Sequence, residues 1–290
     1  MQHSSRQTSW TTSGLALVRR GGLSAAFAVL TLVIPATARA QYSAPADTSN
    51  TTAIGEKYHI EFSGTLWNPT LFGVISSEQF GSNNASDIDF VSDLGYKQTR
   101  FKDMRIVARP SKRSKFRLQY TPVVYTANSV LKRPVVFNNQ TFNVNLPVLS
   151  TFGWKVWRMG FEYDVLYKSR GFVGVLLEAR YTEMSADLRS PVLHEFSVAK
   201  APLPALGIVG RGYILPEVAI NFELSGFKVP DVDKRYQANY FDWDLSGTVN
   251  VTNYVGLQAG WRKMTTFLSV KNDKGDLKFQ GLWFGAAVRY

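Results

Sequence analysis

Side chains able to carry out catalysis are scarce in this sequence. It contains no cysteine, which excludes thiol catalysis, disulfide scaffolds and thiolate metal sites. Apart from His3 near the N-terminus, a histidine-dependent reaction would have to use His59 or His194. His194 precedes Glu195 and has serines nearby, but this spacing fits no arrangement of nucleophile and base that hydrolysis requires. We therefore predict that the chain is not an enzyme and has no catalytic residues.

Carboxylates close together along the chain are the next candidates, because calcium binds clustered carboxylates supplied by loops. Three pairs occur, at Asp87 and Asp89, Asp231 and Asp233, and Asp273 and Asp276. Each pair lacks the full spacing of a calcium-binding loop, and aspartates also favour turns without any metal. We predict no metal site and no cofactor.

Most ionisable residues belong instead to segments in which polar and apolar residues alternate. Over 157–167 every second residue is apolar, and Arg158 and Glu162 lie between the apolar positions. The same period recurs in 239–251 and in 255–262. Successive side chains of a β-strand point to opposite faces, so this period predicts strands with one apolar and one ionic face.

Segments with this period are predicted to be strands, and their connections alternate between short turns and mostly long loops. The predicted strands are 57–67, 100–109, 115–126, 152–167, 172–184, 205–215, 217–228, 239–251, 255–270 and 277–290. Pro216 marks one tight turn, because proline cannot donate to a central ladder. We predict an all-β fold, an up-and-down antiparallel transmembrane β-barrel of about ten strands, with eight or twelve as alternatives.

The polar faces of these segments carry equal numbers of basic and acidic residues. The positions are Glu61, Asp103, Arg105, Arg109, Arg117, Arg158, Glu162, Asp164, Glu178, Arg180, Arg211, Glu223, Asp242, Asp244, Arg262 and Arg289. All the basic members are arginines, whose planar guanidinium pairs carboxylates through two hydrogen bonds and is weakly hydrated. Equal numbers matter because an unpaired charge in a confined interior is costly. We predict that these side chains form a charge network in the lumen.

Aromatic residues near the strand ends share the apolar faces. They are Tyr58, Trp157, Tyr167, Tyr181, Trp243, Trp261 and Tyr290. We predict that they face outward and form girdles at the two membrane surfaces.

The first long connection, 68–99, contains one further pattern. Ser86-Asp87-Ile88-Asp89 has the residue types of a helix N-cap, Val91 and Leu94 follow it, and Gly95 can end a helix. We predict a short helix in this outer loop.

The N-terminal residues predict export from the cytoplasm. A basic stretch ends at Arg19-Arg20, an apolar stretch covers 23–34, and Ala38-Arg39-Ala40 forms a small-x-small cleavage site. We predict a signal peptide over 1–40, an N-terminal periplasmic segment over 41–56 and the barrel over 57–290. Part of the formal net charge of +11 lies in the leader and the remainder is scattered, so no nucleic-acid partner is predicted.

The last predicted strand ends in a distinctive pattern. Leu282, Phe284, Ala286, Val288 and Tyr290 occupy alternate positions up to the C-terminal aromatic residue. This resembles the C-terminal strand of Gram-negative outer-membrane β-barrel proteins, which serves as the barrel-assembly signal. The resemblance covers the leader, the terminal strand and the general strand pattern, and it identifies no subfamily. It implies an outer-membrane location, contact with outer-membrane lipid and lipopolysaccharide, and the barrel-assembly machinery as a partner during biogenesis.

Three functional classes remain open for such a barrel. A charge-filled lumen favours a structural or surface-interaction barrel with ligand-facing outer loops. Inward glycines such as Gly160 and Gly256 would favour a narrow passive pore for small solutes. The third class is an outer-membrane enzyme, either a protease or a lipid A modifying enzyme, which the scarcity of catalytic side chains disfavours.

Overall fold

The computed structural model describes residues 53–77, 86–137, 140–228, 236–270 and 273–290. The predicted signal peptide and most of the predicted periplasmic segment lie outside these residues. Regular structure in the described residues consists of β-strands. None of it is a helix long and apolar enough to span a membrane.

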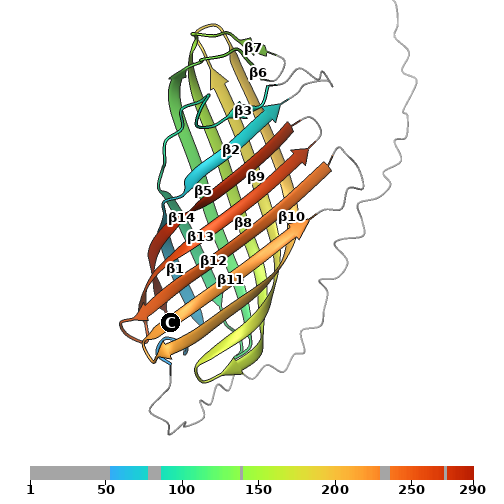
Figure 1. The fold of residues 1–290 in the computed structure, drawn as a ribbon. Coiled ribbons are helices and arrows are strands. Elements are labelled where there is room, and N and C mark those ends of the chain that lie inside the picture. The colour runs from blue at the N-terminus through green and yellow to red at the C-terminus, as the bar shows by residue number, and fades with distance from the viewer. Residues whose placement is uncertain (1–52, 78–85, 138–139, 229–235, 271–272) are drawn as a thin grey trace, which may run out of the picture. The chain divides into compact units, whose positions relative to one another are not determined.

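Ten antiparallel strands form a closed barrel (Figure 1). In order around the sheet they are β1 (Ile60–Trp67), β4 (Phe101–Ala108), β5 (Ser114–Val130), β8 (Pro147–Lys168), β9 (Gly171–Arg189), β10 (His194–Leu215), β11 (Val218–Lys228), β12 (Tyr236–Asn250), β13 (Val255–Val270) and β14 (Asp273–Arg289). Pairing of β1 with β14 closes the sheet. The predicted up-and-down barrel is therefore confirmed, including its number of strands.

Four short strands lie at the end of the barrel that carries the long connections. They are β2 (Thr70–Ser77), β3 (Ile88–Asp89), β6 (Val135–Phe137) and β7 (Gln140–Phe142). β2 continues the line of β1 beyond Pro69 and pairs with the same strand, β14, while β3 adds to the edge of β2. β6 and β7 pair only with each other, as a separate hairpin.

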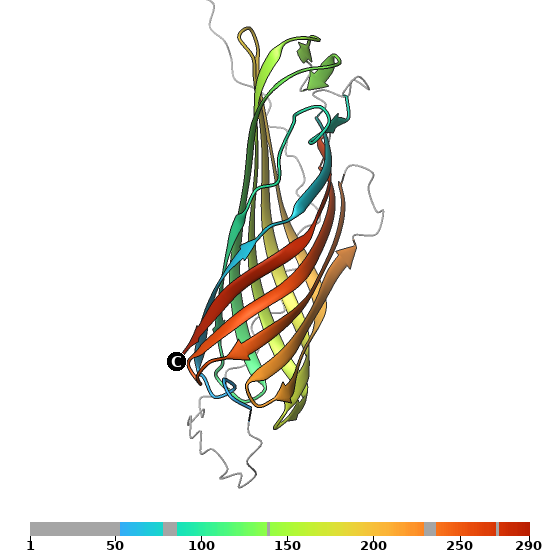
Figure 2. The ribbon, with the colours of Figure 1, turned by 60° about the vertical axis from the view of Figure 1, so that its left-hand side comes forward.

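Four strands, β5, β8, β9 and β10, extend well beyond their predicted ends and form a tall sheet on one side of the barrel (Figure 2). Most of the long loop predicted over 185–204 is therefore strand, and only 190–193 connects β9 to β10. In this region Ala186 and Leu188 are buried inside while Asp187 points outward. Apolar residues therefore face inward and polar residues outward in this region, the reverse of the membrane half. A pattern of outward apolar residues ends before the strands end, so the predicted strands are too short.

The predicted short helix in the first outer loop is not formed. Ile88 and Asp89 pair with β2 instead. One turn follows, in which the Asp89 carboxylate accepts backbone hydrogen bonds from Val91 and Ser92 at 2.9 and 2.7 Å. Gly95 ends this turn with a φ of 70°. Strand pairing and the glycine leave a single turn between them, which is too short for a helix to propagate.

Outward side chains form an exposed apolar belt around the half of the barrel that carries the short turns. On β8, Trp157 is 40% exposed, whereas Arg158 is 3% exposed and lies inside. On β12, Phe241 is 46% exposed and Asp242 is 3% exposed. An apolar belt of this extent faces lipid, and the closed sheet leaves no unpaired backbone in hydrocarbon. Short turns face the periplasm in outer-membrane barrels, so we call this end periplasmic and the other end extracellular.

Candidate functional site

All the charged residues predicted for the polar faces lie inside the barrel. Most are buried, and the half-buried members are Arg105, Arg117, Arg211, Glu223 and Asp244. We call this set, together with Glu56 and Lys115 described below, the lumen network. It occupies the interior of the membrane half, where each guanidinium has a carboxylate within reach, from a strand or from Glu56.

Arg158 lies at the centre of the lumen network. Its guanidinium pairs with Glu178 at 2.8 Å, with Glu223 at 2.6 Å and with Asp242 at 3.3 Å. These three carboxylates come from β9, β11 and β12, so one side chain of β8 links four strands across the lumen.

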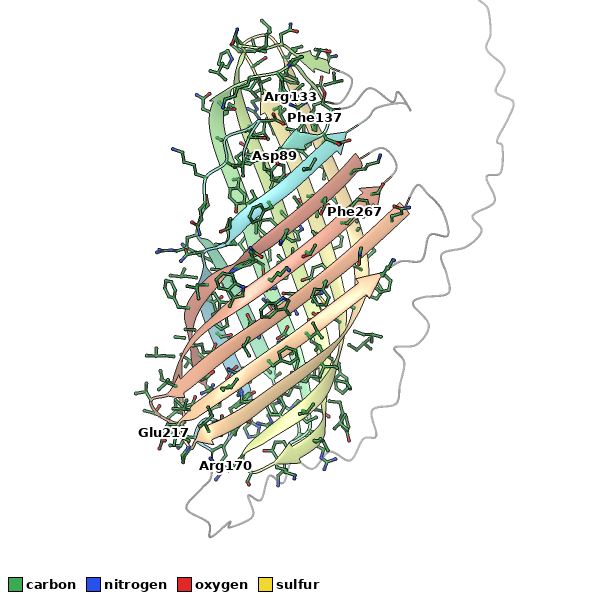
Figure 3. The ribbon with its side chains drawn as sticks, viewed as in Figure 1. Asp89, Arg133, Phe137, Arg170, Glu217 and Phe267 are labelled. Atoms are coloured by element: carbon green, nitrogen blue, oxygen red, sulfur yellow. The ribbon has the colours of Figure 1, made fainter. Side chains whose placement is uncertain are left out.

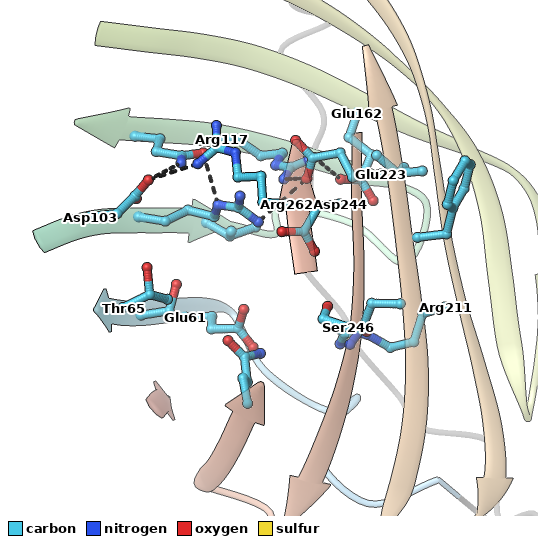
Figure 4. A pocket seen from close by; sticks show the side chains of 18 of the residues that line it. Glu61, Thr65, Asp103, Arg117, Glu162, Arg211, Glu223, Asp244, Ser246 and Arg262 are labelled. Carbon is cyan, nitrogen blue, oxygen red and sulfur yellow. Dashed lines mark hydrogen bonds and ion pairs between the residues drawn. The ribbon is translucent and has the colours of Figure 1, made fainter. Parts of the chain in front are cut away.

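Arg262 extends the same network to the opposite wall (Figure 4). It pairs with Asp242 at 2.7 Å and with Asp103 of β4 at 3.1 Å. Arg117 joins Glu162 and Glu223 from the other side (Figure 4). Ion pairs therefore cross the lumen in several directions.

Two members of the lumen network escaped the sequence analysis. Lys115 is 2% exposed and its Nζ lies 2.6 Å from Glu162 and 3.0 Å from Asp164. Its spacing of two residues from Arg117, on the same face of the predicted strand 115–126, was the available signal. The interior basic set is therefore not made of arginine alone. The second missed member, the carboxylate of Glu56, restores the balance of charge.

Glu56 belongs to an N-terminal plug, residues 53–58, which folds into the periplasmic end of the barrel. Its carboxylate pairs with Arg211 at 2.8 Å and with Arg109 at 3.2 Å, and it accepts a hydrogen bond from the Tyr213 hydroxyl at 2.9 Å. The Ile54 amide also donates to the Pro216 carbonyl at 2.8 Å. The predicted barrel start at residue 57 therefore cuts through a segment that is part of the folded barrel.

The plug should loosen in acid because its ion pairs depend on the charge of Glu56. Burial alone would raise the pKa of Glu56, but the Arg211 and Arg109 guanidinium groups outweigh burial and lower the pKa to about 2. A lowered pKa stabilises the plug fully above the usual value of 4.5, and this stabilisation is lost as the pH falls toward 2.

Hydrogen exchange at the Ile54 amide, corrected for the intrinsic rate, should therefore accelerate between pH 4.5 and 2.5. The variant Glu56→Gln should exchange faster than wild type at neutral pH and lose this pH dependence. An unchanged pH profile in the variant would show that another group holds the plug.

Two aromatic residues predicted to face the membrane lie inside instead. Tyr58 is buried, and the guanidinium of Arg109 lies 5.3 Å from its ring centroid, because residues before β1 turn into the lumen. The ring centroid of Tyr167 also lies 5.4 Å from the Arg109 guanidinium. A bulge between Asp164 and Leu166 shifts the alternation of β8 by one residue, so Tyr167 points inward. The other predicted girdle members, Trp157, Tyr181, Trp243, Trp261 and Tyr290, are exposed or half-buried on outward positions.

The lumen network surrounds a cavity of about 100 Å³ (Figure 4). Thr65, Ser246 and charged side chains of the network line it. A buried water occupies roughly 10 to 15 Å³ of such volume, so several ordered waters fit. Tyr58 of the plug and Trp67 of the outer end of β1 also line the cavity.

The extracellular half of the barrel has an apolar interior, which the sequence analysis did not predict. We call it the outer core; its largest members are Trp67, Phe90, Tyr96, Phe101, Tyr125, Phe137, Phe142, Phe152, Trp154, Tyr240 and Phe279. The rings of Trp154 and Phe279 stack with centroids 5.1 Å apart. Since β8 and β14 are not neighbours in the sheet, this contact spans the interior of the barrel.

The first outer turn and the segment before the β6–β7 hairpin are fastened together at the extracellular end (Figure 3). Arg133 donates to the Asp93 carboxylate at 2.6 Å and to the Asp87 carbonyl at 2.5 Å. The Asp89 carboxylate caps the same turn, and hydrogen bonds from Ser92 and Val91 outweigh burial and lower its pKa. The Asp89 carboxylate thus stabilises the turn, and the Asp87 carbonyl takes part in the contact with Arg133.

The remaining candidates for chemistry lie apart from the lumen. His194 is exposed, with its Nε2 3.3 Å from Asp187, and His59 is exposed beside the start of β1. Asp231 and Asp233 lie outside the described residues. Within the described part of the chain, no group of three or more histidine or carboxylate side chains is arranged to hold a metal ion.

Comparison with known proteins identifies the fold. The sequence matches no known family model and no curated protein. In structure the chain is similar to the outer-membrane protease OmpT from Escherichia coli, with a TM-score of 0.52 and 10% identity over 83% of this chain and 99% of that one. Ail, the attachment invasion locus protein of Yersinia pestis, matches with a TM-score of 0.35 and 9% identity over 80% and 99%. Neisserial surface protein A matches with a TM-score of 0.33 and 15% identity over 80% and 97%.

At identities this low, the similarity shows the fold alone. The likeness to OmpT, the closed sheet and the apolar belt together make the chain a β-barrel of the Gram-negative outer membrane. In this barrel Leu282, Phe284, Val288 and Tyr290 of the C-terminal pattern face outward and are exposed, with Ala286 half-buried among them. Their recognition by the barrel-assembly machinery stays a prediction.

Proposed function

We propose that the chain is a closed barrel that acts through its surface, held by its membrane half and presenting its extracellular half to ligands. The observation that carries this proposal is that side chains obstruct the lumen at three levels. The N-terminal plug occupies the periplasmic end, ion pairs cross the middle, and the outer core fills the extracellular half. A barrel built in this way offers little continuous water to a solute.

Inward glycines favoured a pore in the sequence analysis because they lack side chains. At Gly160 and Gly256, neighbouring side chains occupy the space that a side chain would fill. A side chain on Gly256 would place its first carbon 2.8 Å from the Asn250 Oδ1 and 3.2 Å from the Arg289 Nη1. At Gly160 the same carbon would lie 3.3 Å from Glu178. The glycines make room for neighbouring side chains of the lumen network, which supports a closed barrel over a narrow pore.

The extracellular end of the tall sheet offers a contact surface. Val192 is 75% exposed, Phe196 is 54% exposed and Val198 is 38% exposed, all beyond the apolar belt and among polar neighbours. Apolar side chains exposed in this way mark sites of contact with other molecules. They support a role in surface interaction.

We also propose that the protein is not an enzyme. Catalytic pairs of a histidine and a carboxylate usually lie in a concave, partly desolvated site beside a nucleophile or bound water. The side chain of His194 is 55% exposed and its partner Asp187 also pairs with Arg189. An exposed ion cluster at a hairpin end accounts for these contacts.

Conductance through planar lipid bilayers tests the closed barrel. The refolded wild-type protein is expected to insert without producing steady, stepwise conductance at neutral pH, because the outer core and the lumen network both interrupt the water path. A general porin inserted under the same conditions serves as the positive control. Stable conductance steps with a linear dependence on voltage would contradict the proposal and favour the passive pore.

A further inference from the structure

Lysine marks the point on most barrel strands where the outward face stops being apolar. Followed from the middle of the membrane half toward the extracellular end, the first charged outward residue is a lysine on β4, β8, β10, β11, β13 and β14. These residues, which we call the lysine belt, are Lys102, Lys155, Lys200, Lys228, Lys263 and Lys278. On β9 the corresponding residue is Glu183, and the outward faces of β1, β5 and β12 carry no charge in the described residues.

The lysine belt begins where the hydrocarbon layer ends. On β8 the outward residues from Val165 to Trp157 are apolar, and Lys155 is the next outward residue. A tilted strand needs about 9 to 11 residues to cross the hydrocarbon, so Lys155 lies at the extracellular headgroup layer. Trp157 and Tyr181, which pair across β8 and β9, lie just below it as interfacial aromatics.

Three of these charges form a compact group on the tall sheet. The Glu183 carboxylate lies 3.3 Å from the Lys155 Nζ and 2.9 Å from the Lys200 Nζ, since the three residues are register partners on adjacent strands. One carboxylate cannot neutralise two ammonium groups, so the group keeps a positive charge. Its two lysine side chains are 55% and 54% exposed, and exposed pairs contribute little to stability.

The rest of the lysine belt adds to this excess. Lys102, Lys228, Lys263 and Lys278 form no ion pair with a described carboxylate, and Lys278 lies 5.5 Å from the ring centroid of Phe72. A band of positive charge beside the headgroup layer attracts anionic headgroups. Ammonium groups are compact point charges that suit phosphate oxygens.

We propose that the lysine belt binds the phosphate groups of a phosphorylated glycolipid in the outer leaflet, with Lys155 and Lys200 as its strongest site. Two ammonium groups held side by side can share one phosphate monoester, while the lipid chains lie along the apolar belt below. This inference depends on the membrane position of the barrel and not on the closed lumen, so conductance does not test it.

Native mass spectrometry of the refolded barrel with lipid A carrying two phosphates tests the proposal. The double variant Lys155→Gln with Lys200→Gln should retain this lipid about tenfold less tightly than wild type. The variant Glu183→Gln should retain it more tightly, because it frees both lysines from a competing carboxylate. The control, Lys57→Gln with Lys168→Gln, makes the same change of charge at exposed residues of the periplasmic end and should bind like wild type.

The double lysine variant and Glu183→Gln are expected to change lipid retention in opposite directions, which a purely structural role would not produce. If the group only tied the strands together, Glu183→Gln and the double lysine variant would both lower stability and neither would change lipid retention. A heat-modifiability gel on each variant confirms that the barrel is folded. Equal retention of lipid A lacking phosphates would overturn the proposal. So would displacement of the lipid by millimolar inorganic phosphate, because the site would then recognise a free ion.

Discussion

Replacing Arg158 with methionine is expected to lower the free energy of unfolding by about 3 to 5 kcal/mol, because it leaves buried carboxylates without their shared partner. Arg158 pairs with Glu178, Glu223 and Asp242 at 2.6 to 3.3 Å. All three carboxylates retain contacts to other arginines, but the charge balance of the lumen network is broken. Urea unfolding in lipid vesicles measures the change.

The matched control is Arg113→Met, which removes the same side chain from an exposed periplasmic turn and should change stability little. The loss of stability in Arg158→Lys should fall between those of the other two variants. A lysine keeps the positive charge, but it lacks the planar guanidinium that pairs with three carboxylates at once.

A double variant tests whether the loss arises from the excess of buried negative charge. Glu178→Gln combined with Arg158→Met should cost less than the sum of the two single changes, because together they remove one charge of each sign and keep the lumen network balanced. Strictly additive losses would show that the ion pair between Arg158 and Glu178 contributes nothing to stability.

The sequence predicted the membrane half well because two independent patterns agree there. Outward residues such as Trp157 must be apolar to face lipid, and inward residues such as Arg158 can be ionic because partners on other strands neutralise them. Alternation therefore fixes both the strand and the side that each residue faces. The strand order, the closure and every predicted member of the lumen network follow from this rule.

The N-terminal plug could not be predicted by the same rule. Glu56 lies before the first strand and has no alternating neighbours, so no local pattern indicates that it turns back into the lumen. Its partners Arg109 and Arg211 are distant in sequence and belong to β4 and β10. Only the closed barrel brings them together at the periplasmic end.

The extracellular half was missed for a different reason, because its alternation is present but inverted. On β8 the lipid-facing set ends at Trp157, Lys155 then points outward, and Trp154 and Val156 point inward. Where the same inversion continues on β9 and β10, a rule that assigns apolar residues to the outside leaves 185–204 as loop. The inversion itself marks the level at which lipid gives way to water.

Replacing Trp154 with alanine is expected to lower the free energy of unfolding of the extracellular half by about 3 to 5 kcal/mol. Trp154 is 1% exposed, stacks on Phe279 and donates from its Nε1 to the Thr182 hydroxyl at 2.5 Å. Its removal opens a cavity in the outer core and leaves the Thr182 hydroxyl without this partner. Limited proteolysis of the barrel in vesicles should then cut the extracellular parts of β8 and β9.

The membrane half should survive this change, because the lumen network and the apolar belt do not depend on the outer core. Trp157→Ala is the matched control, since it removes the same side chain three residues along β8 from the opposite face. Trp157 is 40% exposed toward lipid and stacks on Tyr120 with centroids 4.3 Å apart, so its loss should cost about 1 kcal/mol of aromatic pairing beyond the lost apolar area. New extracellular cleavage in Trp154→Ala but not in Trp157→Ala would establish two halves with opposite interiors. Equal cleavage in both variants would mean that the barrel unfolds as one unit, and that the reversal of polarity does not divide its stability.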